Sequence, residues 1–355
     1  MAYTTINKHT DYFNTKLYSG NASTQAITGV GFQPDWCWFK GRNFADNHVS
    51  IDSVRGTNKA VYQDTTGTES TQTHYFTSFD SDGYTLGNSG IMNGSSKTYA
   101  SWNWKAGDSN TSVSASGSGN GAINACTYRA NTTAGFSIVK YTGRNSEISN
   151  GQYTKVTHGL GVKPDYIIIK RLGTAESWVV RGGFSPIKSD YHLQLNAEDA
   201  RNGSFYVGGG DNDDATYFVA GNSGRTNENG NEYIAYVFAS KTGYSKMGAY
   251  TGNGNANGAF VYTGFKPAFI LTKDSSATSW WVITDTTRST HNITSHVLSS
   301  NANNAEASYT YYDVLSNGFK ARNGSSWVNT LNASYTYMAF GQSLVGSNNV
   351  PCTAR

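Results

Sequence analysis

One ten-residue pattern occurs three times in this chain, and it limits the possible folds more than any other feature. The copies read GFQPDWCWFK at 31–40, GVKPDYIIIK at 161–170 and, more loosely, GFKPAFILTK at 264–273. Pro34, Pro164 and Pro267 hold the same place in the three copies, although the whole chain has only 5 prolines. Self-similarity of this kind is the signature of a repeated structural unit.

Two further patterns follow each copy, in the same order and at similar distances. The first reads SDGYTLGNSG at 81–90, DDATYFVAGNSG at 213–224 and SNGFKARNGSS at 316–326. The second reads YASWNWKAG at 99–107, YIAYVFASK at 233–241 and YMAFGQS at 337–343. The repeats therefore cover nearly the whole chain.

The repeats predict an all-β chain of three tandem β-sandwich, jelly-roll-like domains. The predicted boundaries are 1–9 for an N-terminal arm, 10–107 for the first repeat, 108–133 for a Gly/Ser-rich linker, 134–244 for the second repeat and 245–355 for the third with a C-terminal tail. The polar composition of the linker predicts flexibility. The first domain should therefore be placed independently, whereas the second and third adjoin directly and should form a fixed pair.

The opening pattern predicts a central strand in each domain. Proline cannot donate to a sheet ladder, so it belongs at the start of a strand. The residues that follow are apolar on both faces, which is typical of a strand covered on both sides. The residues assigned to this structural motif are Pro34, Asp35, Trp36, Trp38, Pro164, Asp165, Tyr166 and Pro267.

Composition disfavours several kinds of partner. Only 14% of the residues are charged, the net charge is +3 and no run of basic residues occurs, so we expect no nucleic-acid partner. No apolar run is long enough for a membrane span, and the N-terminus does not read as a secretion signal. Cys37, Cys126 and Cys352 lie far apart and predict no disulfide framework, consistent with synthesis in a reducing cytoplasm.

Aromatic residues supply the main candidates for ligand contact. Tryptophan and tyrosine make up much of the 14% aromatic content, and exposed rings of this kind can stack on sugars. The candidates in predicted loops are Trp178, Trp280, Trp281 and Trp327. Trp178 and Trp281 occupy comparable places after their motifs, so a packing role is the stronger alternative for these side chains.

No catalytic chemistry is predicted. A glycosidase needs two carboxylates at a controlled separation. Asp35 and Asp165 recur, but Ala268 takes their place in the third copy, and an acid after such a proline can accept local backbone N–H groups instead. The histidines show no metal-ligand spacing and no nucleophile motif is present. We expect no enzyme activity, no cofactor and no metal site.

The repeated residues resemble a known but uncharacterised repeat domain. The resemblance lies in Phe32 to Lys40, the Asp-Ser-Val-Arg turn within Ile51 to Gly56, Phe79 to Gly87 and Tyr99 to Gly107. This domain is frequent in tail-fibre-like and other virion structural proteins of marine bacteriophages. The Asp-Ser-Val-Arg-Gly turn is missing from the later copies. The resemblance implies a β protein that is made in the host cytoplasm and carried on the virion, with no catalytic residues.

These observations lead to ranked expectations of function. The first is a non-enzymatic tail fibre or host receptor-binding component, exposed on the particle surface and homo-oligomeric, with a trimer favoured. Its partners would be other virion proteins and a host surface glycan or receptor. The alternative is a capsid decoration, cement or head-fibre protein, whose N-terminal arm could lie along a partner protein of the particle. A glycan-cleaving tailspike is the least favoured.

Overall fold

The computed structural model describes residues 4–183, 191–203 and 212–345, and this part of the chain is almost entirely β. Strands account for 45% of the structure and helices for 3%, arranged as several antiparallel sheets. The short helical elements are η1 (His9–Asp11), α1 (Gly90–Asn93) and η2 (Asn145–Glu147). This architecture is consistent with the predicted all-β sandwich class. The first three residues of the predicted arm and the tail at 346–355 lie outside the described residues.

The N-terminal third, residues 13–104, contributes two sheets. Its strands are β1 (Phe13–Ser19), β2 (Gln25–Thr28), β3 (Trp36–Gly41), β4 (Val49–Asp52), β5 (Lys59–Tyr62), β6 (Ser70–Thr71), β7 (Phe76–Asp80), β8 (Gly83–Leu86) and β9 (Thr98–Trp104). The strand orders are β1-β9-β3-β4-β5-β6 and β2-β8-β7.

The middle third, residues 111–238, also contributes two sheets. Its strands are β10 (Thr111–Val113), β11 (Cys126–Asn131), β12 (Phe136–Thr142), β13 (Tyr153–Thr157), β14 (Tyr166–Arg171), β15 (Val179–Gly182), β16 (Tyr191–Gln194), β17 (Asn202–Gly203), β18 (Tyr217–Gly221) and β19 (Glu232–Phe238). The orders are β10-β11-β12-β19-β14-β15-β16-β17 and β13-β18.

The C-terminal third, residues 245–343, has the same kind of pair. Its strands are β20 (Ser245–Thr251), β21 (Phe260–Tyr262), β22 (Phe265–Asp274), β23 (Val282–Asp285), β24 (Thr294–Val297), β25 (Ala307–Leu315), β26 (Gly318–Ala321) and β27 (Ser334–Ser343). The orders are β20-β27-β22-β23 and β21-β26-β25-β24.

One four-strand order recurs in all three thirds. It is β1-β9-β3-β4, β12-β19-β14-β15 and β20-β27-β22-β23. The strands of the repeated motif, β3, β14 and β22, each have a neighbour on both sides, as their apolar runs predicted. Their registers also correspond, because Trp36 pairs with Trp104, Tyr166 with Phe238 and Phe269 with Phe340.

Each motif strand buries its two faces in different cores. Side chains alternate between faces along a strand. In β3, Cys37 and Phe39 pack with Tyr84 of the second sheet in a core that belongs to the N-terminal third. Trp36 and Trp38 point the other way, into a core that all three thirds share. The middle and C-terminal thirds also have a core of their own.

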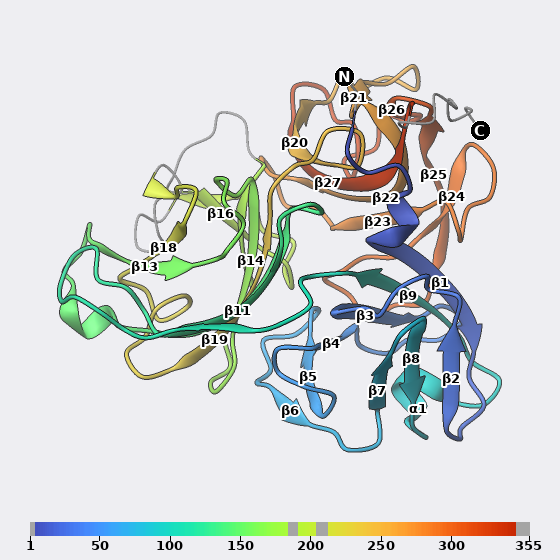
Figure 1. Cartoon of the computed structure of the whole chain (residues 1–355). Coiled ribbons are helices and arrows are strands. Elements are labelled where there is room, and N and C mark those ends of the chain that lie inside the picture. The colour runs from blue at the N-terminus through green and yellow to red at the C-terminus, as the bar shows by residue number, and fades with distance from the viewer. Residues whose placement is uncertain (1–3, 184–190, 204–211, 346–355) are drawn as a thin grey trace.

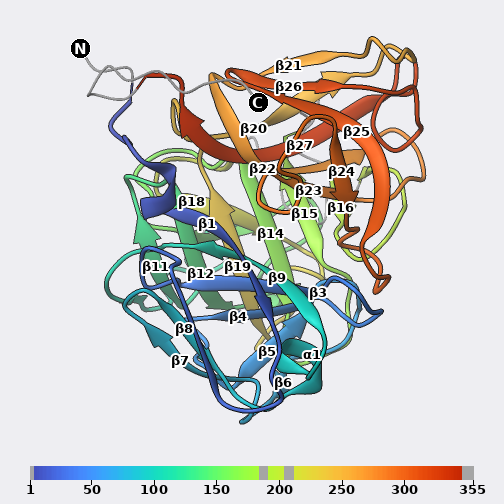
Figure 2. The same ribbon diagram turned by 90° about the vertical axis from the view of Figure 1, so that its right-hand side faces the viewer.

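The shared core lies where the three thirds meet. Figure 1 shows the N-terminal (blue), middle (green) and C-terminal (orange to red) thirds as lobes around a common centre, and Figure 2 shows the same arrangement from the side. Trp36 stacks on Tyr236 at 4.1 Å between ring centroids, Trp104 meets Phe269 at 5.8 Å, and Phe238 meets Phe340 at 5.8 Å. Each third therefore touches both others through buried aromatic rings. The N-terminal third is not independently placed, because its sheet has an aromatic outer face that must be covered.

The stretch expected to be a linker is part of a sheet. Within 108–133 lie β10 and β11, and β11 pairs with β12 along its whole length. The polar composition of this stretch suits half-exposed strands at one side of a sheet. Composition alone does not distinguish such strands from a flexible linker. The N-terminal arm is also fixed on the chain itself: Ile6 lies in the shared core, and His9 bonds the side chain of Gln342.

Candidate functional site

The four tryptophans expected in loops divide into two that are buried and two that are partly exposed. Trp178 and Trp281 are fully buried in the shared core. Trp178 Nε1 donates to the carbonyl of Tyr62 at 2.8 Å, and Trp281 Nε1 donates to the carbonyl of Gln194 at 2.9 Å. Both bonds run to the preceding third, so these indoles join thirds and present no face to a glycan.

The N-terminal third places a histidine where the others place these tryptophans. His48 Nε2 lies 3.0 Å from the carbonyl of Ser299 in the C-terminal third. Burial lowers the pKa of His48 well below its ordinary value, so the ring is neutral and can donate this hydrogen bond. The same joint therefore occurs three times around the shared core.

Buried ion clusters occupy two of the contacts between thirds. Asp52, Arg55 and Glu69 form one, with Arg55 Nε 2.6 Å from Asp52 Oδ2. Asp285, Arg288 and Glu306 form the other, with the equivalent distance 2.5 Å. In the second cluster Asp285 also accepts the backbone N–H of Arg288, as Asp52 does from Arg55.

The second cluster corrects one sequence observation. The Asp-Ser-Val-Arg turn is not missing from the third copy, because Asp285-Thr-Thr-Arg288 makes the same turn. Only the aspartate and the arginine, which make the buried bonds, are kept. The side chains between them differ, which hid the match.

The acid of each cluster also bonds a neighbouring third. Asp52 accepts the hydroxyl of Tyr236 at 2.9 Å, and Asp285 accepts Nε1 of Trp102 at 3.0 Å. The middle third has Gly182 in place of the acid. The residue that corresponds to Tyr236 and Trp102 on β27 is Met338, which has no N–H or O–H to donate. The contact between the middle and C-terminal thirds therefore lacks both the acid and its hydrogen-bond donor.

The lysine that ends each motif copy is buried rather than available for chemistry. Burial lowers the pKa of Lys40, Lys170 and Lys273 to about 8 in each case. Their ammonium groups donate to backbone carbonyls, among them Asn303 for Lys40 and Thr66 for Lys170, both in another third. Lys40 and Lys170 therefore link thirds, whereas Lys273 donates to Asp274 and Ala277 within its own third.

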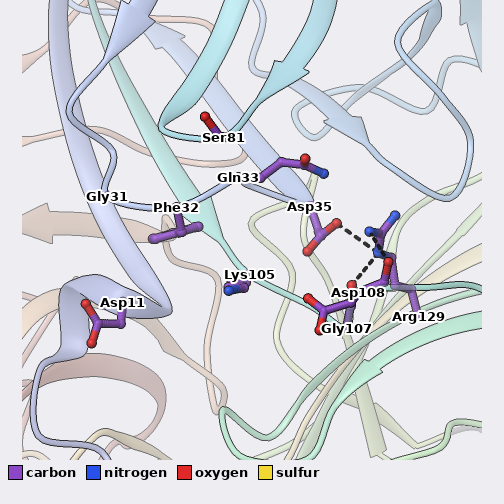
Figure 3. Close-up of a pocket in the computed structure, with 10 residues that line it drawn as sticks. All are labelled: Asp11, Gly31, Phe32, Gln33, Asp35, Ser81, Lys105, Gly107, Asp108 and Arg129. Atoms are coloured by element: carbon purple, nitrogen blue, oxygen red, sulfur yellow. Dashed lines mark hydrogen bonds and ion pairs between the residues drawn. The ribbon is translucent and has the colours of Figure 1, made fainter.

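Asp35 lies at a polar pocket between the N-terminal third and β11 (Figure 3). The pocket has a volume of about 490 Å³ and is lined by Asp11, Gly31, Phe32, Gln33, Asp35, Ser81, Lys105, Gly107, Asp108 and Arg129. Arg129 comes from β11, so the strand that replaced the expected linker also forms one wall. Carboxylate, ammonium, amide and hydroxyl groups stand side by side, which suits hydrogen bonding more than capture of an ion of one sign.

Both oxygens of Asp35 are occupied by protein donors. Oδ2 accepts the backbone N–H of Ala106 at 2.7 Å, and Oδ1 accepts the hydroxyl of Ser53 at 2.8 Å and lies 3.0 Å from Arg129 Nε. Burial raises the pKa of Asp35, while Arg129 acts in the opposite direction. This carboxylate is arranged to hold the end of β9 beside β3, and it lacks the free oxygen that a base or nucleophile needs.

Asp165 makes the corresponding bond without the ion pair. Its Oδ2 accepts the backbone N–H of Ser240 at 2.7 Å, and the side chain is exposed. Both acids thus accept backbone N–H groups. The donors are not in the local turn, where they were expected, but just beyond the ends of the neighbouring strands β9 and β19. Ala268 in the third copy has no such bond to make.

Trp280 and Trp327 belong to a partly exposed aromatic cluster on the C-terminal third. Their rings are parallel within 4° at 5.2 Å between centroids. Tyr309, which is 42% exposed, lies 5.3 Å from Trp327 edge-on and 5.3 Å from the parallel ring of Tyr311. We call Trp280, Tyr309, Tyr311 and Trp327 the aromatic cluster. The sequence reading missed both tyrosines, although their spacing in a strand places them on one face.

Metal and thiol chemistry find no support in the described part of the chain. Within it, no three histidine, cysteine, aspartate or glutamate side chains gather as metal ligands. Burial raises the pKa of the Cys37 and Cys126 thiols, which disfavours the reactive thiolate. Among the described residues, no helix has the length and apolar character needed to cross a membrane.

Comparison with known proteins gives one match. No curated protein and no solved structure matches the chain. A family model described as a domain of unknown function (DUF7483) matches residues 8–343. This match spans all three thirds, the shared core, the Asp35 pocket and the aromatic cluster. The chain therefore belongs to the DUF7483 family.

Proposed function

We propose that the chain consists of three tandem copies of one β-sandwich that have closed around a common core. The recurring strand order supports this, as do the joints that recur at the same motif positions. Asn93, Asn227 and Asn329 give a further match, because each is fully buried and its side-chain oxygen accepts a backbone N–H near the turn that precedes the second sheet.

On this scaffold we propose a non-enzymatic bacteriophage virion structural protein, exposed on the particle and acting as a tail fibre or host receptor-binding component. The supporting observation is a difference between the three copies. Among the described residues, large exposed apolar side chains gather on the C-terminal third, where Phe260, Tyr262, Tyr309 and Leu331 are 42 to 64% exposed.

At the places of Phe260 and Tyr262 the other copies have small or polar residues; in the second copy these are Lys155 and Thr157, which flank Val156 opposite Phe218. Val261 pairs with Phe319 as Ile27 pairs with Tyr84, so Phe260 and Tyr262 correspond to Ala26 and Thr28. Aromatic rings that served packing would recur in all copies and be buried. Phe260 and Tyr262 have no aromatic counterpart at these places, and exposed rings of this kind are typical of a contact surface.

Labelled particles and cell binding test this proposal together. Antibody against the chain, imaged on intact virions, should mark the tail tip, and the purified protein should bind host cells. Label over the whole head would instead favour the alternative, a capsid decoration, cement or head-fibre protein. That alternative is supported by the three-lobed shape, which has no extended shaft (Figure 1).

Two parts of the proposal have separate tests. A homo-oligomer, with a trimer favoured, predicts a sedimentation mass of three chains. A mass of one chain would contradict this part of the proposal. A glycan-cleaving tailspike is the least supported function. It would release new reducing ends from host polysaccharide above a boiled control, and we expect no release.

A further inference from the structure

The aromatic cluster has the arrangement of a small-ligand platform. Trp327 is held between Trp280, parallel to it, and Tyr309, edge-on to it. Tyr311 is buried and anchors Tyr309 through the parallel stack. Rings fixed by one another lose little conformational freedom when a ligand arrives, which favours binding.

The polar atoms of these rings are available. Within the described residues, neither indole N–H of Trp280 and Trp327 nor the hydroxyl of Tyr309 has a hydrogen-bond partner. Tryptophan and tyrosine at the surface combine an apolar face with a polar edge. The four side chains carry no formal charge at neutral pH, so the platform offers stacking and hydrogen bonds but no attraction for an ion.

The cluster is specific to the C-terminal third. Trp280 directly precedes Trp281, whose equivalents are His48 and Trp178, so Trp280 corresponds to Asn47 and Ser177. Trp327 stands two residues before the buried Asn329 and corresponds to Ile91 and Arg225, which precede Asn93 and Asn227. Two aromatic side chains therefore replaced unrelated residues at neighbouring places of one copy, where the shared fold does not require them.

We infer that Trp280, Trp327 and Tyr309 form a binding site for an uncharged oligosaccharide. The flat C–H face of a pyranose ring stacks on the partly exposed indole of Trp280, on the side away from Trp327, and its equatorial hydroxyls reach the free N–H and O–H groups at the ring edges. This inference deepens the proposed host-binding function and depends on it only for the origin of the glycan.

Direct titration tests the site. Cellohexaose, chitohexaose and laminarihexaose are neutral probes with exposed C–H faces, and the purified full chain should bind at least one of them in calorimetry. Binding should also shift the indole N–H resonances of Trp280 and Trp327 in an NMR spectrum. Trp280→Ala should weaken the affinity about tenfold or more, the loss expected for one stacked aromatic contact.

Two variants separate stacking from general damage. Trp280→Phe keeps a stacking ring and should retain most of the affinity that Trp280→Ala loses. Val162→Ala is the control for loss of an exposed apolar side chain, because Val162 is 42% exposed and lies on the middle third, outside the aromatic cluster. This control should leave the affinity unchanged.

The outcomes also distinguish this inference from the proposed function. No binding to any of the three hexasaccharides, or equal loss with Val162→Ala, would overturn the saccharide site. If the protein bound host cells and Trp280→Ala bound them equally well, host binding would stand without this site. If the hexasaccharides bound but host cells did not, the site would stand and the host-binding role would fail.

Discussion

The contacts between thirds are of two kinds, a buried ion cluster with a hydrogen-bond donor and an apolar contact. Where the N-terminal third meets the middle third, one buried Asp-Arg-Glu cluster bonds Tyr236, and where it meets the C-terminal third, a second such cluster bonds Trp102. Where the middle third meets the C-terminal third, Gly182 and Met338 take the places of acid and donor. A buried acid needs every partner, whereas an apolar contact needs only shape. In this chain acid and donor are present together at two contacts and absent together at the third.

Breaking a cluster should give the largest effect. Arg288→Met leaves Asp285 buried without its cation, while Glu306 keeps its ion pair with Arg42, and we expect the free energy of unfolding to fall by about 3–5 kcal/mol. Urea denaturation measures it. Arg322→Met is the matched control, because Arg322 pairs with Asp313 at a 39% exposed side chain and should cost about 1 kcal/mol or less. Equal losses would contradict the special role of the buried cluster.

Removing only the donor should have a smaller effect. Tyr236→Phe deletes the hydroxyl that bonds Asp52 and should cost about 2 kcal/mol, as hydrogen bonds to charged groups do. At the apolar contact, Met338→Leu conserves volume and should cost less than about 1.5 kcal/mol. The comparison fails if the leucine variant is the less stable of the two in thermal or urea unfolding.

The two motif acids give a matched pair of lesser effect. Asp35→Asn removes the charge beside Arg129 and should cost about 1.5 kcal/mol, whereas Asp165→Asn at its exposed site should cost about 0.5 kcal/mol. Neither change should affect binding of oligosaccharide or host cells. A larger loss for Asp165→Asn would mean that the ion pair with Arg129 contributes nothing.

The buried lysines predict a mild dependence of stability on pH. Their pKa of about 8 in the folded protein lies below the value of about 10.4 for an unfolded lysine. Between these values the unfolded chain binds more protons, so the free energy of unfolding should rise as the pH is raised from about 8 to 9.5. Urea titrations at several pH values measure the slope, and Lys170→Met should reduce it. A fall over this window would contradict the prediction.

Sequence patterns predicted the strands better than their surroundings. The apolar run Tyr166 to Ile169 correctly indicated a central strand, because alternation shows that both faces are covered. It does not show what covers them. An independently placed first domain would keep Trp36 and Trp38 in its own core. The structure instead places both in the shared core, where Trp36 stacks on Tyr236 of the middle third.

The candidate site was predictable in part for a similar reason. Trp280 and Trp281 are neighbours in a chain segment that enters a strand, so their side chains point to opposite sides. The recurrence of Trp178 and Trp281 at comparable places favoured packing for Trp281, which is buried, and left the role of Trp280 open. Arg129 and Tyr309 were missed because their roles depend on strands that pair only in the folded chain.

The shared core also constrains the order of events during synthesis. Trp36 and Trp104 are synthesised well before Phe340, which helps to cover them. At ordinary translation rates the ribosome needs roughly ten to fifty seconds to pass from one to the other. During that interval the nascent chain carries an uncovered aromatic sheet face, a surface that invites aggregation or a chaperone. Its ability to fold in a cell therefore depends on protecting that face until the last strand emerges.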